Sequence, residues 1–266
     1  MGADFAFRHT ACPEPGSVGG LNVLDLFAEN ALLTAISNVG VIPVVTIDDA
    51  AKAPNLARAL CAGGLNVIEI VLRTPEALNC VRAIRDEVPE CVVGVGTVVR
   101  PSDIVDGYEA GAMFAVSPGF TPDLLAAGLE APVPYLPAVC TPAEVLQVMS
   151  AGYDLMKFFP AELMGGVEAL KALSGPFPSV KFCCTGGIPQ NKLALYREQS
   201  NVAAVGASFM APKGAIEAAD WRLIEDLARD ARAHWEGRAS VISPWDASPV
   251  RRKAAGKPSI LRSAKV

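Results

Sequence analysis

One lysine lies near the end of an apolar run, where charged side chains are uncommon. Lys157 belongs to the run from Leu155 to Phe159. A free lysine amine is protonated at neutral pH, but a site hidden from water disfavours the ammonium and leaves a lone pair able to attack a carbonyl. The pattern therefore indicates a nucleophile that forms a Schiff base. The structural alternatives are a lysine that reaches solvent from the strand end and a lysine paired with a carboxylate.

A carboxylate lies inside a second apolar run. Glu69 is in the β-branched run from Val67 to Leu72, and Arg73 follows it. Alternate residues of an extended chain share a face, so Glu69 and Arg73 point to the same side. If that side is the interior of a barrel, Glu69 can move protons and Arg73 can hold a substrate carboxylate through two parallel hydrogen bonds. A buried Glu–Arg pair without a catalytic role is the alternative.

Glycine-containing segments follow several apolar runs. Residues 185–188 (Thr-Gly-Gly-Ile) follow the seventh run and residues 205–208 (Val-Gly-Ala-Ser) follow the eighth. Barrels often bind phosphate between these two loops, because glycines expose backbone N–H groups there. Residues 94–97 (Gly-Val-Gly-Thr) and 117–119 (Ser-Pro-Gly) end the third and fourth runs. Together these segments place small residues and hydroxyls around one mouth, although each alone is also typical of an ordinary turn.

Eight short apolar runs would have to position these residues. They are Val41–Thr46, Val67–Leu72, Cys91–Val98, Met113–Val116, Pro134–Leu136, Leu155–Phe159, Val180–Cys184 and Val202–Val205. Most lack polar alternation, as expected of parallel strands buried on both faces, and helix-like segments separate them. We therefore predict a (β/α)₈ TIM barrel with reactive groups at the carboxyl ends of the strands. A doubly wound open sheet is the alternative, but its G-x-G-x-x-G marker is absent.

The same pattern predicts where helices begin and which lysine is structural. Thr74, Thr121 and Thr141 each precede a proline, which predicts a capping hydroxyl followed by proline at the first helical position. Thr141 and Glu144 also fit a capping box. Lys181 begins the seventh run, four residues before Thr185, so we expect it at the opposite mouth in a structural role.

The chain ends differ from this repeat. We predict a loose N-terminal arm over residues 1–20, a single-domain barrel over 21–235 with an N-terminal capping helix near 22–38, and a flexible tail over 236–266. The tail is basic, holding Arg238, Arg251, Arg252, Lys253, Lys257, Arg262 and Lys265 against Glu236 and Asp246. The alternative for the tail is an arm that docks on an acidic neighbouring subunit.

Composition excludes several classes of protein. With 266 residues and 51% hydrophobic residues, the chain has ample material for a core, and no run of 18 uncharged apolar residues is present. Because residues 1–20 contain charged residues and no continuous apolar run, we expect no signal peptide. A net charge of −5 gives no reason to expect nucleic-acid binding. Seven cysteines without a C-x-x-C pair favour reduced thiols in the cytoplasm. The two histidines, His9 and His234, lie near the chain ends, so we expect no histidine-built metal centre, and a magnesium site built from carboxylates alone is the alternative. We expect no cofactor.

Six motifs in order resemble one known family, the 2-keto-3-deoxy-6-phosphogluconate (KDPG) / 4-hydroxy-2-oxoglutarate (KHG) aldolases. The motifs are residues 69–74 (Glu-Ile-Val-Leu-Arg-Thr), 94–98 (Gly-Val-Gly-Thr-Val), 116–119 (Val-Ser-Pro-Gly), 157–162 (Lys-Phe-Phe-Pro-Ala-Glu), 175–177 (Gly-Pro-Phe) and 185–188 (Thr-Gly-Gly-Ile). The resemblance runs from about Val41 to Trp221. The chain departs from the family pattern at Ala138 and Ala207, where glycine is usual, and at Phe209, where tryptophan is common.

The resemblance implies a role for each matching residue. It implies Lys157 as the Schiff-base lysine and Glu69 as the general acid/base. The expected substrate-binding residues are Arg73 and Thr97 at the carboxylate end, Pro118 and Phe159 as pocket walls, Gly186, Gly187 and Ser208 at the phosphate, and also Thr185. It also implies a cytoplasmic, metal-independent lyase that forms a homotrimer, with a 2-keto acid or sugar phosphate as its small-molecule partner and neither nucleic acid nor membrane.

The expected reaction is cleavage of KDPG to pyruvate and glyceraldehyde 3-phosphate in the Entner-Doudoroff type of carbohydrate metabolism. The same chemistry on 2-keto-3-deoxy-6-phosphogalactonate or KHG, decarboxylation of oxaloacetate at the same imine, and a non-catalytic sugar-phosphate-binding barrel remain as alternatives.

Overall fold

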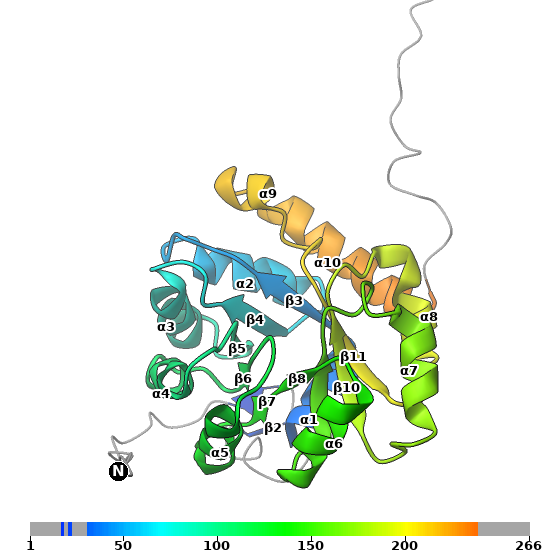
Figure 1. The fold of residues 1–266 in the computed structure, drawn as a ribbon. Helices are drawn as coiled ribbons and strands as arrows, with labels where there is room; N and C mark the ends of the chain where they lie inside the picture. Colours follow the sequence, from blue (N-terminus) through cyan, green and yellow to red (C-terminus); the bar gives the residue numbers. More distant parts are fainter. Residues whose placement is uncertain (1–16, 19–20, 23–30, 239–266) are drawn as a thin grey trace, which may run out of the picture.

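The chain folds into a closed barrel of parallel strands surrounded by helices (Figure 1). The structure is a computed structural model, and it describes residues 17–18, 21–22 and 31–238. The barrel strands are β3 (Val41–Val45), β4 (Val67–Val71), β5 (Val92–Gly96), β6 (Ala115–Val116), β7 (Tyr135–Leu136), β8 (Ala138–Val139), β9 (Leu155–Phe158), β10 (Lys181–Thr185) and β11 (Val202–Ala207). Their order in the sheet is β7-β6-β5-β4-β3-β11-β10-β9-β8.

The barrel closes through Pro137. β7 and β8 stand at opposite ends of the sheet order, yet only this residue separates them in the chain. They are two halves of one strand, interrupted because proline has no N–H to donate to the ladder. The carbonyl of Pro137 still accepts a hydrogen bond from Lys157 N–H at 2.9 Å. The barrel therefore has eight strand positions, which confirms the predicted (β/α)₈ fold.

Helices cover the outside of the barrel (Figure 1). They are α2 (Ala53–Ala62), α3 (Ala77–Glu87), α4 (Pro101–Glu109), α5 (Pro122–Glu130), α6 (Pro142–Ser150), α7 (Gly166–Ser174), η2 (Gln190–Lys192), α8 (Leu193–Arg197), α9 (Lys213–Glu217) and α10 (Trp221–Glu236). The strands between them are buried almost throughout, as the lack of polar alternation predicted. Every barrel strand thus contributes to one continuous core.

Two of the three predicted helix starts are confirmed. Thr121 accepts a hydrogen bond from Leu124 N–H at 3.2 Å, and Thr141 forms a capping box with Glu144. The prediction for Thr74 is wrong. Its hydroxyl instead donates to the carbonyl of Ile47 at 2.6 Å, and α3 begins three residues later, at Ala77.

The N-terminal helix is shorter than predicted within the described residues. α1 (Ala31–Val39) contacts β3, β4 and β11, as a capping helix should. Residues 17–18 and 21–22 form a two-stranded antiparallel pair, β1 and β2, where the sequence predicted a loose arm and the start of the helix. The described residues do not include the rest of the predicted arm (residues 1–16 and 19–20), residues 23–30 of the predicted helix, or the tail beyond residue 238. No helix in the described parts of the chain is long and apolar enough to cross a membrane.

Candidate active site

A buried ion pair occupies the interior of the barrel. Lys157 on β9 and Glu69 on β4 are 5% and 4% exposed, and 3.3 Å separates the lysine Nζ from the glutamate Oε1. Unpaired charges at this depth would cost several kcal/mol each, so the two groups stabilise each other. The structure therefore brings together the two residues that the sequence selected on separate strands, 88 positions apart.

The carboxylate of Glu69 occupies space that a neighbouring glycine leaves open. A Cβ added at Gly96 on β5 would lie 2.0 Å from Glu69 Oε1. The backbone of β5 therefore approaches the carboxylate more closely than any residue with a side chain would allow. From the sequence, Gly96 is only one of several small residues expected at the mouth, because its contact with Glu69 joins two strands and no local pattern reveals it.

Apolar and neutral groups surround the lysine amine. The Phe159 ring centroid lies 5.4 Å from Lys157 Nζ. Ala138 on β8 and Cys183 on β10 pair with Lys157 in register, so their side chains share its face. Burial, followed by the negative charge of Glu69, raises the pKa of Cys183 to about 12, so this thiol remains neutral at physiological pH. The pair is thus enclosed by groups that add no competing charge.

A second pair of predicted residues meets at the ends of β4 and β5. Arg73 Nε donates to Thr97 Oγ1 at 3.2 Å. Thr97 has a φ of +63°, in the left-handed region, so β5 ends at Gly96, two residues before the predicted end at Val98. Arg73 is exposed, so its guanidinium remains open to a ligand at the mouth.

The loop after β10 presents backbone donors. Gly186 and Gly187 have φ values of +114° and +74°. The N–H groups of residues 186–188 donate to no described protein group, while the carbonyls of Thr185 and Gly186 accept bonds from Ala161 and Glu162. Consecutive free N–H groups in such a turn form an anion-binding concavity. The residues predicted to bind phosphate therefore have a suitable backbone conformation.

The loop after β11 lies beside it, because Thr185 and Gly206 pair in register at the ends of the two strands. Ser208 is exposed there, at the edge of a pocket of about 390 Å³ that Val44, Thr46 and Lys213 also line. The N–H group of Ser208 donates to no described group. The second predicted phosphate loop thus opens on the same side of the barrel.

Thr185 has a buried hydroxyl that lacks a partner. Its Oγ1 is inaccessible to solvent and has no hydrogen-bonding partner among the described residues. A Cβ at Gly206 would lie 2.5 Å from this oxygen, so the strand backbone fits closely against it. An unpaired buried hydroxyl costs about 1–3 kcal/mol, which a ligand in the barrel mouth would recover.

Two other predicted residues, Pro118 and Lys181, lie at the ends of barrel strands. Pro118 is exposed at the end of β6 and has no described polar contact, while the adjacent Ser117 bonds Tyr135 at 2.7 Å and the carbonyl of Gly119. Burial raises the pKa of Tyr135 to about 12 despite the hydrogen bond with Ser117. Lys181, predicted to be structural, donates to the carbonyl of Ser200 at 2.8 Å from the amino end of β10.

Comparison with known proteins identifies the family. The model of the KDPG and KHG aldolase family matches residues 33–227. A 2-dehydro-3-deoxy-phosphogluconate aldolase of Pseudoalteromonas atlantica is 45% identical over 193 residues, which cover 73% of this chain and 90% of that protein. This chain belongs to the KDPG and KHG aldolase family. It is therefore a lyase, and the non-catalytic alternative is not supported.

Solved structures of family members share the fold. A KDPG aldolase from Legionella pneumophila, with pyruvate captured as a covalent carbinolamine intermediate, has a TM-score of 0.73 and 41% identity, and the match covers 75% of this chain and 97% of that one. The enzyme of Zymomonas mobilis with 3-phosphoglycerate has a TM-score of 0.74 and 39% identity, covering 80% and 100%.

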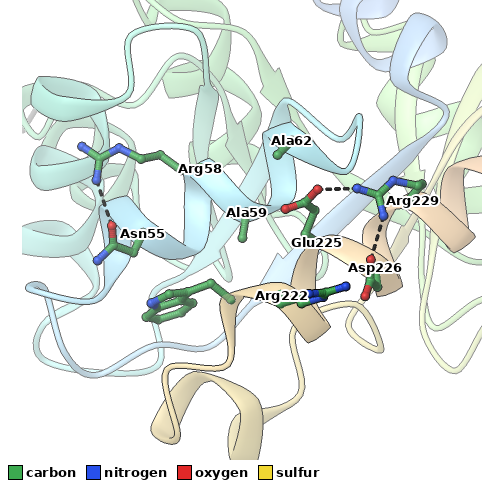
Figure 2. Close-up of a pocket in the computed structure, with 9 residues that line it drawn as sticks. Asn55, Arg58, Ala59, Ala62, Arg222, Glu225, Asp226 and Arg229 are labelled. Atoms are coloured by element: carbon green, nitrogen blue, oxygen red, sulfur yellow. Dashed lines mark hydrogen bonds and ion pairs between the residues drawn. The ribbon is translucent and has the colours of Figure 1, made fainter.

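A larger pocket of this aldolase lies away from the ion pair. It has a volume of about 600 Å³ and lies on the outside of the barrel, between α2 and α10 (Figure 2). Arg229 there pairs with Glu225 and with Asp226 at 2.7 Å, and Arg58 donates to Asn55 at 3.0 Å. No lysine lines this pocket. Without a lysine to form an imine, it lacks the nucleophile that the aldolase chemistry requires.

Within the described parts of this family member, no group of three or more His, Cys, Asp and Glu side chains is arranged to hold a metal ion.

Proposed function

We propose that this chain is a class I aldolase that cleaves KDPG to pyruvate and glyceraldehyde 3-phosphate through a Schiff base on Lys157. The observation that carries the proposal is the buried contact of 3.3 Å between Lys157 and Glu69. An amine and a carboxylate within hydrogen-bonding reach of each other are the nucleophile and the proton carrier that this chemistry needs.

The first step is attack of Lys157 Nζ on the C2 ketone. The nearby Glu69 accepts a proton from the ammonium, so the lone pair becomes available. Addition gives a carbinolamine. Glu69 then returns its proton to the departing hydroxyl group, so that water leaves, a protonated imine forms and the carboxylate is regenerated. The covalent carbinolamine with pyruvate in the Legionella pneumophila relative supports this step. The imine then withdraws electrons from the C3–C4 bond.

Glu69 carries the proton in the second step. It removes the proton of the C4 hydroxyl, directly or through a water molecule, while the C3–C4 bond breaks and the imine nitrogen takes the electron pair. This releases glyceraldehyde 3-phosphate and leaves an enamine of pyruvate. Glu69 then assists protonation of C3, and hydrolysis of the imine releases pyruvate and regenerates Lys157. Covalent catalysis thus divides one difficult carbanion-forming step into easier ones.

The acid end of the substrate is assigned to Arg73 and Thr97. Their mutual bond of 3.2 Å orients the guanidinium at the mouth, where it can accommodate a carboxylate through two parallel hydrogen bonds. Phe159, close to the amine, and Pro118, at the rim, form walls of the pocket. Positioning of this kind holds the C2 carbonyl in reach of Lys157.

The phosphate end is assigned to the loops after β10 and β11. The free N–H groups of residues 186–188, together with Ser208, offer donors without the charge of a side chain. The unpaired hydroxyl of Thr185 bonds the substrate between the two ends. The Zymomonas mobilis relative with 3-phosphoglycerate supports recognition of a phosphorylated three-carbon unit.

KHG is a second candidate substrate, because the family includes aldolases of both acids. It has the same 2-keto acid end and lacks a phosphate, so it would use Lys157, Glu69 and Arg73 but fewer of the loop donors.

We also propose a cytoplasmic homotrimer. The cytoplasmic location is based on the seven cysteines without a C-x-x-C pair, and six of these cysteines are free thiols in the described residues. The trimer is based on the resemblance to the family. Sedimentation velocity of the purified chain tests this part, and a monomer at micromolar concentration would contradict it.

A substrate comparison tests the main proposal. Pyruvate released from KDPG and from KHG is measured by coupling to lactate dehydrogenase. Hydrogen bonds to a charged group contribute about 1.5–3 kcal/mol, so we expect kcat/KM for KDPG to exceed that for KHG by about tenfold or more. Equal values would contradict the assignment of the phosphate loops, and no pyruvate from either acid would contradict the proposed function.

A further inference from the structure

We propose that Glu162 is a positioning residue that holds the loop of residues 186–188 in its phosphate-binding conformation. The inference rests on the proposed function and extends it to a residue that touches neither the imine nor the substrate. Glu162 ends the motif that begins at Lys157, yet the reaction itself assigns it no role. Its contacts join the loop after β9 to the phosphate loop and to the two elements that follow it.

The backbone makes the first connection. Glu162 N–H donates to the carbonyl of Gly186 at 3.0 Å, and Ala161 N–H donates to the carbonyl of Thr185 at 2.8 Å. These two bonds continue the pairing of β9 and β10 beyond the strand ends. They direct the carbonyls of the phosphate loop towards the protein, so its N–H groups remain free on the other side.

The side chain makes the second connection. Glu162 Oε1 accepts a hydrogen bond from Tyr196 OH at 2.7 Å, and Oε2 pairs with Lys192. Lys192 ends η2 and Tyr196 lies in α8, the two elements that directly follow the phosphate loop. Glu162 therefore holds the phosphate loop itself, through the carbonyl of Gly186, and the two elements that directly follow the loop.

The packing around Glu162 leaves little freedom for another arrangement. Tyr196 is fully buried, and the Glu162 side chain is 20% exposed. Burial, followed by the hydrogen bond to Glu162, raises the pKa of Tyr196, so the phenol remains a donor. A Cβ added at Gly187 would lie 3.4 Å from Glu162 Cβ, so the glutamate stem packs directly against the loop.

Charge explains why a carboxylate is tolerated beside an anion site. A free carboxylate would repel phosphate, but both oxygens of Glu162 are occupied by donors, and Lys192 neutralises its charge. The pair therefore positions the loop without opposing the ligand. Loss of the ion pair would let the loop populate conformations whose N–H groups do not converge.

The test is Glu162→Gln, which keeps the shape of the side chain and removes the ion pair. We expect KM for KDPG to rise about 5–30-fold, the equivalent of about 1–2 kcal/mol. KM for KHG, which has no phosphate, and the rate of imine formation with pyruvate should change less than about twofold, because Glu162 does not reach the acid end. Tyr196→Phe, which removes only the second bond to the carboxylate, should give a smaller change with the same selectivity.

Glu168→Gln is the matched control. Glu168 lies on the exposed side of α7 and pairs with Lys171 at 2.8 Å, so it should leave both KM values unchanged. An equal loss with KDPG and KHG, or no loss with either, would overturn the role assigned to Glu162. If Glu162→Gln does not fold, Tyr196→Phe decides by the same ratio. Wild-type protein that cleaves neither acid would instead contradict the proposed function, before any variant is compared.

Discussion

The two ends of the proposed substrate site are built in different ways. Deep in the barrel, Lys157 and Glu69 are side chains with fixed chemistry, both at most 5% exposed. At the mouth, the loop of residues 186–188 offers backbone N–H groups, and its glycines have positive φ. The deep region depends on which functional groups are present. The mouth depends on the conformation of a turn, and therefore on residues that hold the turn in place.

This difference predicts two kinds of sensitivity. A change deep in the barrel should slow the chemical step, whereas a change at the mouth should weaken binding of the phosphorylated end alone. A change at a helix cap on the outside of the barrel should lower stability and leave both the chemical step and substrate binding nearly unchanged.

The largest effect is expected for Glu69→Gln. The amide cannot take the proton from the C4 hydroxyl, so kcat for KDPG should fall by about 10²–10⁴, the usual contribution of general acid–base catalysis. Imine formation with pyruvate should still occur. Steady-state kinetics and reductive trapping with borohydride measure the two steps separately, and unchanged turnover would remove Glu69 from the mechanism.

Gly96→Ala tests the same step without changing the catalytic groups. The added Cβ would lie 2.0 Å from Glu69 Oε1, so the carboxylate must move, and kcat should fall in the direction of Glu69→Gln. Gly175→Ala is the matched control, since its Cβ would meet no atom within 4 Å. A Gly96→Ala enzyme with wild-type kcat would show that the position of the carboxylate is not critical.

A smaller and more selective effect is expected for Gly187→Ala. Its φ of +74° costs a residue with a Cβ about 1–2 kcal/mol, which corresponds to a rise of about 5–30-fold in KM for KDPG. KM for KHG should change little. Gly214→Ala, at a glycine with open space and no positive φ, serves as the control. If KDPG and KHG were affected equally, the mouth would not be specific for phosphate.

The smallest effect is expected at a helix cap outside the site. Burial alone would raise the pKa of Glu144, but hydrogen bonds from Cys140 and Thr141 lower it below its ordinary range. A lowered folded-state pKa contributes stability above the unfolded value, about 4.3, and that stability is lost as the pH falls through the folded value.

Glu144→Gln should therefore reduce the free energy of unfolding by about 0.5–1 kcal/mol at pH 7 and by less below about pH 4, with kcat and KM unchanged. Urea unfolding at the two pH values measures the difference. Glu130→Gln, on an exposed residue in the last turn of α5, is the control. A deficit that grew as the pH fell would contradict the sign.

The sequence predicted the strands and selected candidate site residues that meet in the barrel, because the signals for both are local. A lysine and a glutamate within apolar runs, and glycines after them, are visible along the chain, and the barrel rule places all of them at one mouth. Lys157, Glu69, Arg73 and Thr97 indeed lie in pairs whose contacts are 3.3 and 3.2 Å.

Contacts between distant segments could not be predicted in this way. Two such contacts, that of Gly96 with Glu69 and that of Tyr196 with Glu162, depend on how neighbouring strands and loops approach each other. Thr74 shows the same limit, since a tertiary acceptor, the carbonyl of Ile47, replaced the local cap that the Thr-Pro pattern predicted.

Reductive trapping of the imine tests the central claim most directly. Protein incubated with pyruvate and borohydride is digested, and the modified peptide is identified by mass spectrometry. We expect the pyruvate-derived mass on the peptide that contains Lys157, and none in Lys157→Met. Added mass on another lysine such as Lys181, or no added mass in the wild-type protein, would contradict the account.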